Sequence, residues 1–348
     1  MARPELTIMG AGIFGLSIAW AATMRGAKVR VIERHGIGAG SSGGPVGSLS
    51  PHVPEAWNAK KAFQLDSLLI AESWWAAVTI ASGQPSGYGR TGRLQPLADA
   101  RAVAMAQTRQ TEALTLWRGL ADWQVVPIRG AVWEPQSPSG YMVHDTLTAR
   151  LNPVLALAAL ATAITAKGGE IIIGDEAPDG PTIWANGADG LEDLSAHFAQ
   201  PIGSAVKGQA LLLRCDARIQ PQLFVDSLHI VPHSDGTVAI GSTSETKWDD
   251  PQSTDAQLDA LHQKAILACP ALADAPIITR WAGLRPRAKS RAPMLGAWPD
   301  RTGHFIANGG FKIGFGMAPK VAEVMADLVI DGKDSIPPEF QVEASLKL

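Results

Sequence analysis

The chain has 348 residues, which is enough for about two domains with sizeable hydrophobic cores. Hydrophobic residues make up 46% of the chain and charged residues 18%, a globular composition that excludes an intrinsically disordered protein. The 30 lysines and arginines nearly balance the 33 acidic residues, so the net charge of -3 gives no basic footprint for nucleic-acid binding.

The cysteine content and the hydropathy bear on the compartment. Cys215 and Cys269 are too few for a disulfide framework and form no C-x-x-C pair. The uncharged stretch 6–24 is long enough to span a membrane, but its three glycines indicate a strand, a turn and a helix instead. We therefore expect a cytoplasmic protein without a membrane span.

The first elements form a βαβ unit. The hydrophobic pattern predicts a buried strand over 6–9, a glycine turn over 10–15, a helix over 16–25 and a second strand over 28–32. Glycine and serine then dominate residues 36–47, a composition that lets the backbone approach a ligand closely. A flexible linker is the alternative, although connections directly after such a unit are usually short.

Helices and strands alternate through the rest of the chain. The predicted helices cover 60–82, 101–122, 154–167, a segment around 258–268, and 319–330. The predicted strands cover 88–97, 170–173, 182–185, 206–213, 228–231, 237–240 and 304–307. A polar turn over 233–236 separates two of these strands and predicts an antiparallel hairpin. This order predicts one domain built from discontinuous segments, with the middle pieces forming a second.

The turn at residues 10–15 carries the strongest motif. Its sequence Gly-Ala-Gly-Ile-Phe-Gly matches G-x-G-x-x-G between a strand and a helix, and Glu33 follows eighteen residues after the last glycine. The glycines permit the turn, the approach of a pyrophosphate and close helix packing, and the helix N-terminus attracts the anion. Glu33 is placed to accept from ribose hydroxyls and disfavours NADP. Glycines that serve packing alone are the alternative, and the motif does not separate NAD from FAD.

Four later segments identify a family. They are GAGSSGGPVGSL at 38–49, IVPHSDGTVAIGST at 230–243, WAGLRP at 281–286 and NGGFKIGFGMAP at 308–319. In this order they resemble the FAD-dependent D-amino-acid oxidase superfamily, and most of all its glycine oxidase and sarcosine oxidase-like members. The resemblance covers residues 6–332 and is specific for the superfamily, though not for a substrate.

The resemblance implies an α/β fold with a Rossmann-like FAD-binding domain and a second α+β substrate domain that contains an antiparallel sheet. The first would comprise residues 1–84, 145–205 and 284–348, and the second residues 85–144 and 206–283. FAD would be noncovalent, because neither cysteine matches an attachment position. The implied FAD-binding residues are Gly10, Gly12, Ile13, Phe14, Gly15, Glu33, Arg34, Ser41, Ser42, Val46, Gly47, Ser48, Gly187, Gly310, Phe311, Lys312, Ile313, Gly314, Phe315, Gly316 and Met317.

Three residues are predicted to act on the substrate. Arg285 matches the arginine with which the family holds the substrate carboxylate through two parallel hydrogen bonds; a structural arginine is the alternative. Lys312 falls where glycine oxidases carry a second arginine. A lysine there keeps the positive charge but cannot make the two parallel hydrogen bonds of a guanidinium. His52 follows the first glycine loop and is placed to reach the flavin or the substrate amine, although a histidine that bonds the backbone is equally consistent.

Several positions depart from the family pattern. Phe311 replaces a tyrosine, Gly310 a histidine and His229 a tyrosine, which predicts a rebuilt substrate pocket. The segment 169–184 is also short, so the residues that contact adenine are not assigned. His229 and His233 are four residues apart but lack an acidic or cysteine partner nearby, so we expect no metal site.

The predicted function is oxidation of the C–N bond of a small amino acid or N-substituted amino acid. The α-hydrogen would leave as hydride to flavin N5, and the resulting imine would hydrolyse. Oxygen or another acceptor would take the electrons. Trp248 and Trp281 are expected on the substrate side. A flavin enzyme acting on a modified tRNA uridine and a non-catalytic flavin-binding member are the alternatives.

Overall fold

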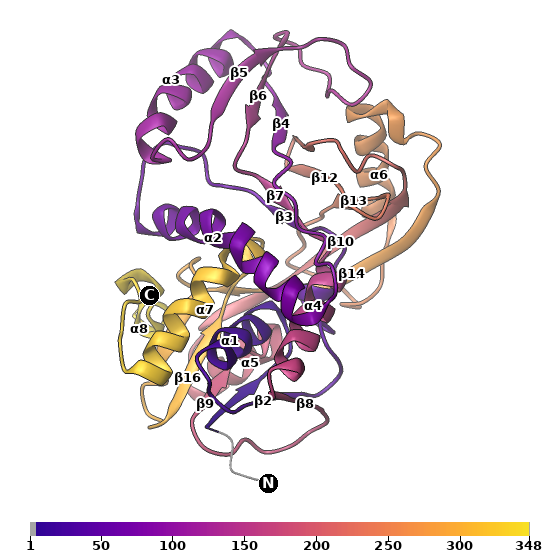
Figure 1. The fold of residues 1–348 in the computed structure, drawn as a ribbon. Coiled ribbons are helices and arrows are strands. Elements are labelled where there is room, and N and C mark those ends of the chain that lie inside the picture. Colours follow the sequence, from indigo (N-terminus) through magenta and orange to yellow (C-terminus); the bar gives the residue numbers. More distant parts are fainter. Residues whose placement is uncertain (1–4, 348) are drawn as a thin grey trace.

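The two main sheets of the fold lie in different halves of the molecule in the computed structural model (Figure 1). The structure describes residues 5–347. One sheet has six strands in the order β15-β16-β9-β1-β2-β8, and we call it the small sheet. Its strands are β15 (Met294–Ala297), β16 (His304–Asn308), β9 (Thr182–Trp184), β1 (Leu6–Met9), β2 (Val29–Glu33) and β8 (Glu170–Ile173). All neighbours pair in parallel except β15 and β16, which is the Rossmann-like arrangement expected from the βαβ unit.

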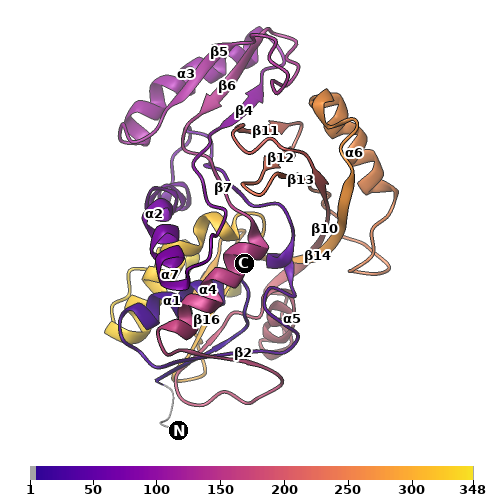
Figure 2. The same ribbon diagram turned by 45° about the vertical axis from the view of Figure 1, so that its right-hand side comes forward.

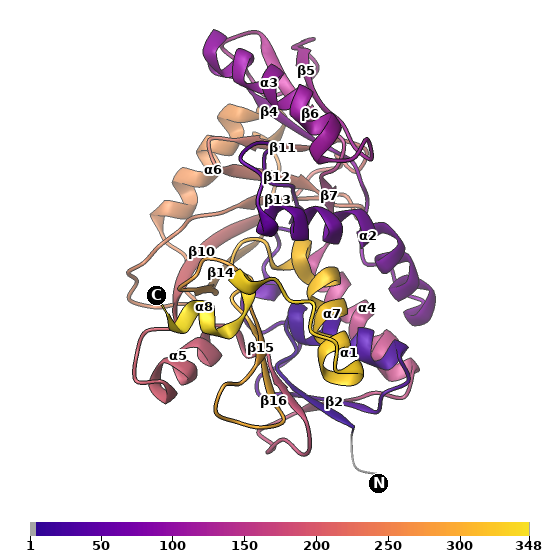
Figure 3. The same cartoon turned by 90° about the vertical axis from the view of Figure 1, so that its left-hand side faces the viewer.

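Helices from distant parts of the chain cover the small sheet. They are α1 (Ile13–Met24), α4 (Pro153–Ala166), α5 (Gly187–His197) and α7 (Gly314–Asp331), and α2 (Ala59–Ser82) packs on α4 and α7 rather than on the sheet. Helix α1 packs against α4 and α7, and α2 crosses the same two helices (Figure 3). The sequence of α1 is apolar on every side, so it is a central helix, buried from its first residue through Thr23.

The second sheet has eight strands, and we call it the large sheet. In spatial order they are β14 (Ile277–Ala288), β10 (Gly203–Arg214), β13 (Thr237–Gly241), β12 (Leu228–Pro232), β11 (Gln222–Val225), β4 (Arg93–Pro96), β6 (Tyr141–Asp145) and β5 (Trp123–Pro127). Every neighbouring pair is antiparallel except β11 and β4. Helix α6 (Ala256–Ala268) packs beside β10, β12 and β13, and α3 (Ala100–Leu116) beside β5 and β6 (Figure 2).

Two smaller features complete the fold. Strands β3 (Ser48–Leu49) and β7 (Ala149–Arg150) form a short antiparallel pair. Helix α8 (Val342–Leu346) packs beside β15 near the end of the described chain. Among residues 5–347, no helix combines the length and the apolar character needed to cross a membrane.

The predicted fold class and most of the predicted elements are confirmed, and the three largest differences in boundaries are in α7, α3 and β4. Helix α7 begins at Gly314 rather than at Pro319, which lies inside it. The predicted helix 101–122 ends at Leu116, where β5 soon follows, and the predicted strand 88–97 is reduced to four residues. The division into two domains stays a prediction; two of its boundaries fall inside the paired strands β10 and β14.

Candidate active site

A cavity of about 1180 Å³ extends from the carboxyl ends of the small sheet to one face of the large sheet. The predicted site residues that line it are Gly10, Gly12, Ile13, Phe14, Glu33, Arg34, Ser41, Ser42, Val46, Ser48, His52, Gly187, Arg285, Gly310, Phe311, Lys312, Ile313, Gly314, Phe315 and Gly316. The fold therefore brings segments from both ends of the sequence to one space.

Three predicted site residues do not line this cavity. A Cβ at Gly15 would lie 1.9 Å from the carbonyl oxygen of Gly10, and one at Gly47 would lie 2.0 Å from that of Leu151. These glycines permit close backbone packing beside the cavity. Met317 is fully buried among the core residues of α7.

The turn between β1 and α1 presents backbone to the cavity. Gly10 has φ of +109°, and a Cβ there would lie 2.6 Å from the carbonyl oxygen of Ala185. At Gly12 the nearest obstacle to a Cβ is the side chain of Ser42, 3.2 Å away. The Ile13 N–H donates to Ser42 Oγ at 3.0 Å, which joins the helix start to the glycine-serine loop. This helix N-terminus provides backbone donors and a positive dipole end.

Glu33 lies at the carboxyl end of β2, in the position its spacing predicts. One carboxylate oxygen accepts from the Ala11 N–H at 2.8 Å and the other accepts from the His35 N–H at 3.0 Å. These bonds orient the carboxylate beside the cavity. Asp175, which follows the neighbouring strand β8, also lines this end and lies 3.5 Å from Arg34.

The large sheet forms the opposite wall. Trp281, Ala210, Gly241, His229 and Phe224 are register partners on five neighbouring strands, so their side chains share one face of the sheet. All but the glycine line the cavity. Trp248, the other tryptophan expected on the substrate side, does not line it.

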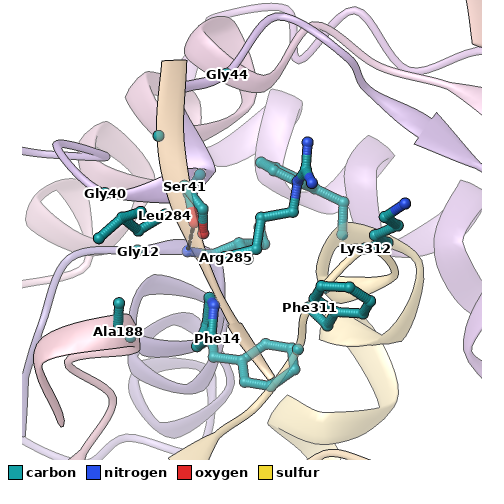
Figure 4. A pocket seen from close by; sticks show the side chains of 18 of the residues that line it. Gly12, Phe14, Gly40, Ser41, Gly44, Ala188, Leu284, Arg285, Phe311 and Lys312 are labelled. Carbon is teal, nitrogen blue, oxygen red and sulfur yellow. Dashed lines mark hydrogen bonds between the residues drawn. The ribbon is translucent and has the colours of Figure 1, made fainter. Parts of the chain in front are cut away.

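Arg285 extends from β14 into this space (Figure 4). The residue is 7% exposed, and its Nη1 donates to the carbonyl oxygen of Thr243 at 3.2 Å. Gly208 on the neighbouring strand makes room for it, because a Cβ there would lie 1.6 Å from Nη2. Burial lowers the pKa of Arg285 to about 10, and the nearby Glu245 charge opposes that shift. The guanidinium therefore stays charged at neutral pH.

Phe311 and Lys312 form the loop before α7, beside Arg285 (Figure 4). Phe311 has φ of +45°, and its N–H donates to the carbonyl oxygen of Pro286 at 3.0 Å. The Lys312 ammonium lies 5.7 Å from the centre of the Phe311 ring. Burial lowers the pKa of Lys312, and the positive charge of Arg285 lowers it further.

The Gln64 side chain holds both the backbone and the ring of His52. Its N–H donates to Gln64 Oε1 at 3.0 Å, and its Nδ1 also hydrogen-bonds that oxygen. Gln64 in turn donates to the carbonyl oxygen of Ser50 at 3.2 Å. Because Gln64 Oε1 is an acceptor, Nδ1 carries the proton and Nε2 is the acceptor of the ring. Burial lowers the pKa of His52.

Sequence reasoning missed Arg93, Gln95 and Phe224, which line the large-sheet wall. Arg93 Nε donates to Asp145 Oδ2 at 2.9 Å, and both side chains are buried. The Arg93 guanidinium lies 5.5 Å from the centre of the Phe224 ring, and the His229 ring lies 4.6 Å from it. An arginine and a glutamine two residues apart on one predicted strand were the available signal, since they occupy the same face.

A comparison with protein families identifies the chain. The model of the DAO family, described as FAD dependent oxidoreductase, matches residues 5–328. The chain belongs to this family. It is therefore an FAD-dependent oxidoreductase, and FAD is the cofactor that the sequence predicted.

Individual relatives of this flavoprotein agree with that assignment. The bifunctional protein ThiO/ThiG of Nostoc is 27% identical, over 99% of this chain and 55% of the relative. The glycine oxidase of Geobacillus kaustophilus is 25% identical, over 94% of this chain and 93% of the relative. The chain thus spans about half the length of the ThiO/ThiG proteins and nearly all of this glycine oxidase.

Solved structures share the fold. The structure of the Geobacillus kaustophilus glycine oxidase matches with a TM-score of 0.83 at 21% identity, covering 98% of this chain and 99% of the other. Iminodiacetate oxidase from Chelativorans sp. BNC1 matches with a TM-score of 0.80 at 21% identity, covering 95% and 97%. At these identities the likeness establishes the fold of the flavoprotein.

The residues present fit FAD. The space beside Gly12 and the start of α1 is open to a pyrophosphate, and the Ser42 hydroxyl, which accepts from Ile13, keeps its own hydrogen for a phosphate oxygen. Glu33 would hold ribose hydroxyls, and residues 310–316 would face the flavin opposite the large sheet. Among residues 5–347, no group of three or more histidine, cysteine or acidic side chains could hold a metal ion.

Proposed function

We propose that this flavoprotein oxidises the C–N bond of a small amino acid or an N-substituted amino acid. The observation that carries the proposal is Arg285, a buried charged guanidinium on the cavity wall. In the part of the chain that the structure describes, no carboxylate forms a salt bridge with it. A buried cation without such a partner is suited to an anionic ligand, because the pairing offsets its desolvation. The names of the glycine oxidase relatives support an amino acid.

Arg285 would act by orientation. Its guanidinium would hold the substrate carboxylate through two parallel hydrogen bonds, while the Thr243 carbonyl fixes its direction. Bound FAD supplies a hydride acceptor, N5, for the hydrogen on the substrate α-carbon. The substrate leaves as an imine that water hydrolyses.

His52 would manage the proton on the substrate amine. The α-hydrogen leaves as hydride only from the neutral amine, so the ammonium form must lose a proton first. Burial lowers the pKa of His52, and Gln64 engages Nδ1, which leaves Nε2 as a proton acceptor at the cavity. We assign His52 this role and Lys312 a supporting role in binding the acidic part of the substrate.

We also propose oxygen as the electron acceptor, so that hydrogen peroxide accumulates during turnover. The noncovalent state of FAD and the cytoplasmic location remain predictions. Acid precipitation tests the first, because noncovalent flavin is released into the supernatant.

The experiment that tests the proposal follows the visible spectrum of the purified holoenzyme under anaerobic conditions. A panel of glycine, D- and L-amino acids and N-methyl amino acids is added one at a time, and bleaching of the flavin band is expected with at least one. If kcat/KM then rises with pH along the amine pKa of each of two substrates, the neutral amine is the reacting form. Absence of bleaching with the whole panel would contradict the proposed function.

A further inference from the structure

The charges that line the cavity are unevenly distributed. The acidic residues that line it are Glu33, Asp175, Asp189 and Asp193, which lie at the end of β2, after β8 and on α5. Two of the basic residues that line the cavity are paired with carboxylates, Arg34 with Asp175 at 3.5 Å and Arg280 with Asp259 at 2.8 Å. The basic residues Arg93, Arg285 and Lys312 line the other end, with no acidic side chain of the described chain lining the cavity beside them. The lining of the substrate end therefore carries a net positive charge.

The three cations at the substrate end differ in what neutralises them. Arg93 is paired with Asp145 at 2.9 Å. Within residues 5–347, neither Arg285 nor Lys312 forms a salt bridge, and the contacts of Lys312 are with the Phe311 ring. A substrate carboxylate at Arg285 neutralises one of these two charges. The charge of Lys312 remains, in the same part of the cavity (Figure 4).

The wall near Lys312 offers uncharged polar groups as well as charge. His229 is half-buried on β12, and within the described chain its buried Nδ1 atom has no hydrogen-bond partner. Its ring centre lies 4.6 Å from that of Phe224, the Arg93 guanidinium lies 5.5 Å from the same Phe224 ring, and Lys312 lines the same cavity. Gln95 lies on the same face of β4 as Arg93 and lines the cavity. An anion beside Lys312 would find these donors around it.

We propose that the substrate is an amino dicarboxylic acid, whose second acidic group lies between Lys312 and the wall formed by Arg93, Gln95 and His229. This inference rests on the proposed function, because it takes the first carboxylate to be at Arg285. The second anion neutralises the remaining charge, and the compact ammonium of Lys312 suits a point contact rather than a two-pronged one.

The kinetic test compares pairs of substrates that differ by one carboxylate. Iminodiacetate is set against sarcosine, and aspartate against alanine of the same configuration. The wild type is expected to favour the diacid by roughly tenfold or more in kcat/KM, the range of a charge-assisted hydrogen bond. Lys312→Met should remove most of this preference, and Lys312→Arg should keep much of it. A wild type that prefers the monoacid of both pairs overturns the inference.

A binding test needs no turnover. Isothermal titration calorimetry measures the affinity of the holoenzyme for succinate and for butyrate at low ionic strength. Succinate is expected to bind roughly tenfold more tightly, and Lys312→Met should reduce the difference to little or none. The matched control is Lys320→Met, which removes the same charge from α7 at a lysine that pairs with Glu323 outside the cavity. The control should bind succinate as the wild type does.

The kinetic test and the calorimetric test distinguish a failure of the second anion site from a failure of the proposed function. Equal binding of succinate and butyrate by the wild type overturns the second anion site, even if glycine or sarcosine is oxidised. If no amino acid reduces the bound FAD, the proposed function fails, and the calorimetric comparison still decides whether the second anion site exists.

Discussion

The two ends of the cavity use different parts of the chain to make a site. At the Glu33 end, the lining comes from a few short segments that present backbone, as in the turn between β1 and α1. At the Arg285 end, strands β14, β12, β11 and β4 each contribute one or more side chains to a shared face. Backbone geometry defines the first end, and side-chain charge and volume define the second. Substitutions should therefore have different consequences at the two ends.

The largest effect is expected from glycine substitutions at the backbone-built end. In Gly15→Val the new Cβ would lie 1.9 Å from the backbone oxygen of Gly10, which has no room to move, so the protein should not fold. In Gly12→Val the nearest obstacle is the Ser42 hydroxyl at 3.2 Å, which can rotate. This variant should fold and lose FAD, because the side chain fills the space of the pyrophosphate.

Circular dichroism and the visible flavin absorbance per protein measure the two effects separately. Soluble, folded Gly12→Val protein with full FAD content would contradict the assignment of this end to the pyrophosphate. A folded Gly15→Val protein would show that the turn relaxes, contrary to the packing argument.

At the side-chain-built end, the largest loss of stability is expected from Asp145→Ala. This change leaves the buried Arg93 guanidinium without its partner, and the cost should be about 3 to 5 kcal/mol in the free energy of unfolding. Chemical denaturation of the holoenzyme measures it. Asp216→Ala breaks the exposed pair with Arg218 and serves as the control, with no measurable change expected. Equal, small effects of both changes would mean that Arg93 finds another partner or reaches water.

Arg285→Ala tests the same end through activity. Removing the cation that holds a buried carboxylate should cost about 2 to 5 kcal/mol in kcat/KM, and Arg285→Lys should recover part of it. FAD content should not change, since the residue is assigned to substrate. Gly208→Ala is a matched variant that keeps the charge and displaces the guanidinium, because its Cβ would lie 1.6 Å from Nη2.

A decarboxylated substrate analogue separates carboxylate binding from structure. The wild type should oxidise the analogue poorly, and the Arg285→Ala substitution should lower kcat/KM for the analogue only a little further. If the Arg285→Ala substitution lowers kcat/KM for the analogue as much as it lowers kcat/KM for the acid, the arginine is structural and the assigned substrate class is wrong.

The Glu33 end of the cavity could be predicted from the sequence more directly than the Arg285 end. The turn at 10–15 and Glu33 were predicted from the spacing of a motif, the loop at 310–316 was predicted from resemblance, and all three reach the cavity. Arg285 and Lys312 were predicted from resemblance rather than from spacing. Their proximity depends on a strand and a loop that meet only in the folded chain.

Arg93 and Phe224 could not be predicted in the same way. Arg93 lies in a short strand of four residues, and Phe224 lies in another strand of four residues that was not predicted from the sequence. Their position depends on β11 pairing in parallel with β4, across a gap of more than a hundred residues. A register of this kind is set by long-range packing, and local propensity carries little information about it.

The last prediction concerns the pH dependence of stability at the side-chain-built end. Burial, together with the charges of Arg93 and Lys312, lowers the pKa of His229 to about 3. The unfolded imidazole binds a proton below about pH 6.5, whereas the folded one stays neutral down to about pH 3. The unfolded state therefore holds more protons in this interval, and stability falls as the pH drops through it.

His229→Phe removes this proton uptake while keeping a ring against Phe224, whose ring centre lies 4.6 Å from that of His229. Between neutral pH and about pH 5, the wild type should lose roughly 2 kcal/mol more of its free energy of unfolding than His229→Phe does. Urea denaturation at several pH values measures the difference. Parallel profiles for wild type and His229→Phe would mean that the imidazole is protonated in the folded state. In that case water or a counter-ion reaches the His229 imidazole and stabilises its protonated form, so the large-sheet wall at the substrate end of the cavity is solvated.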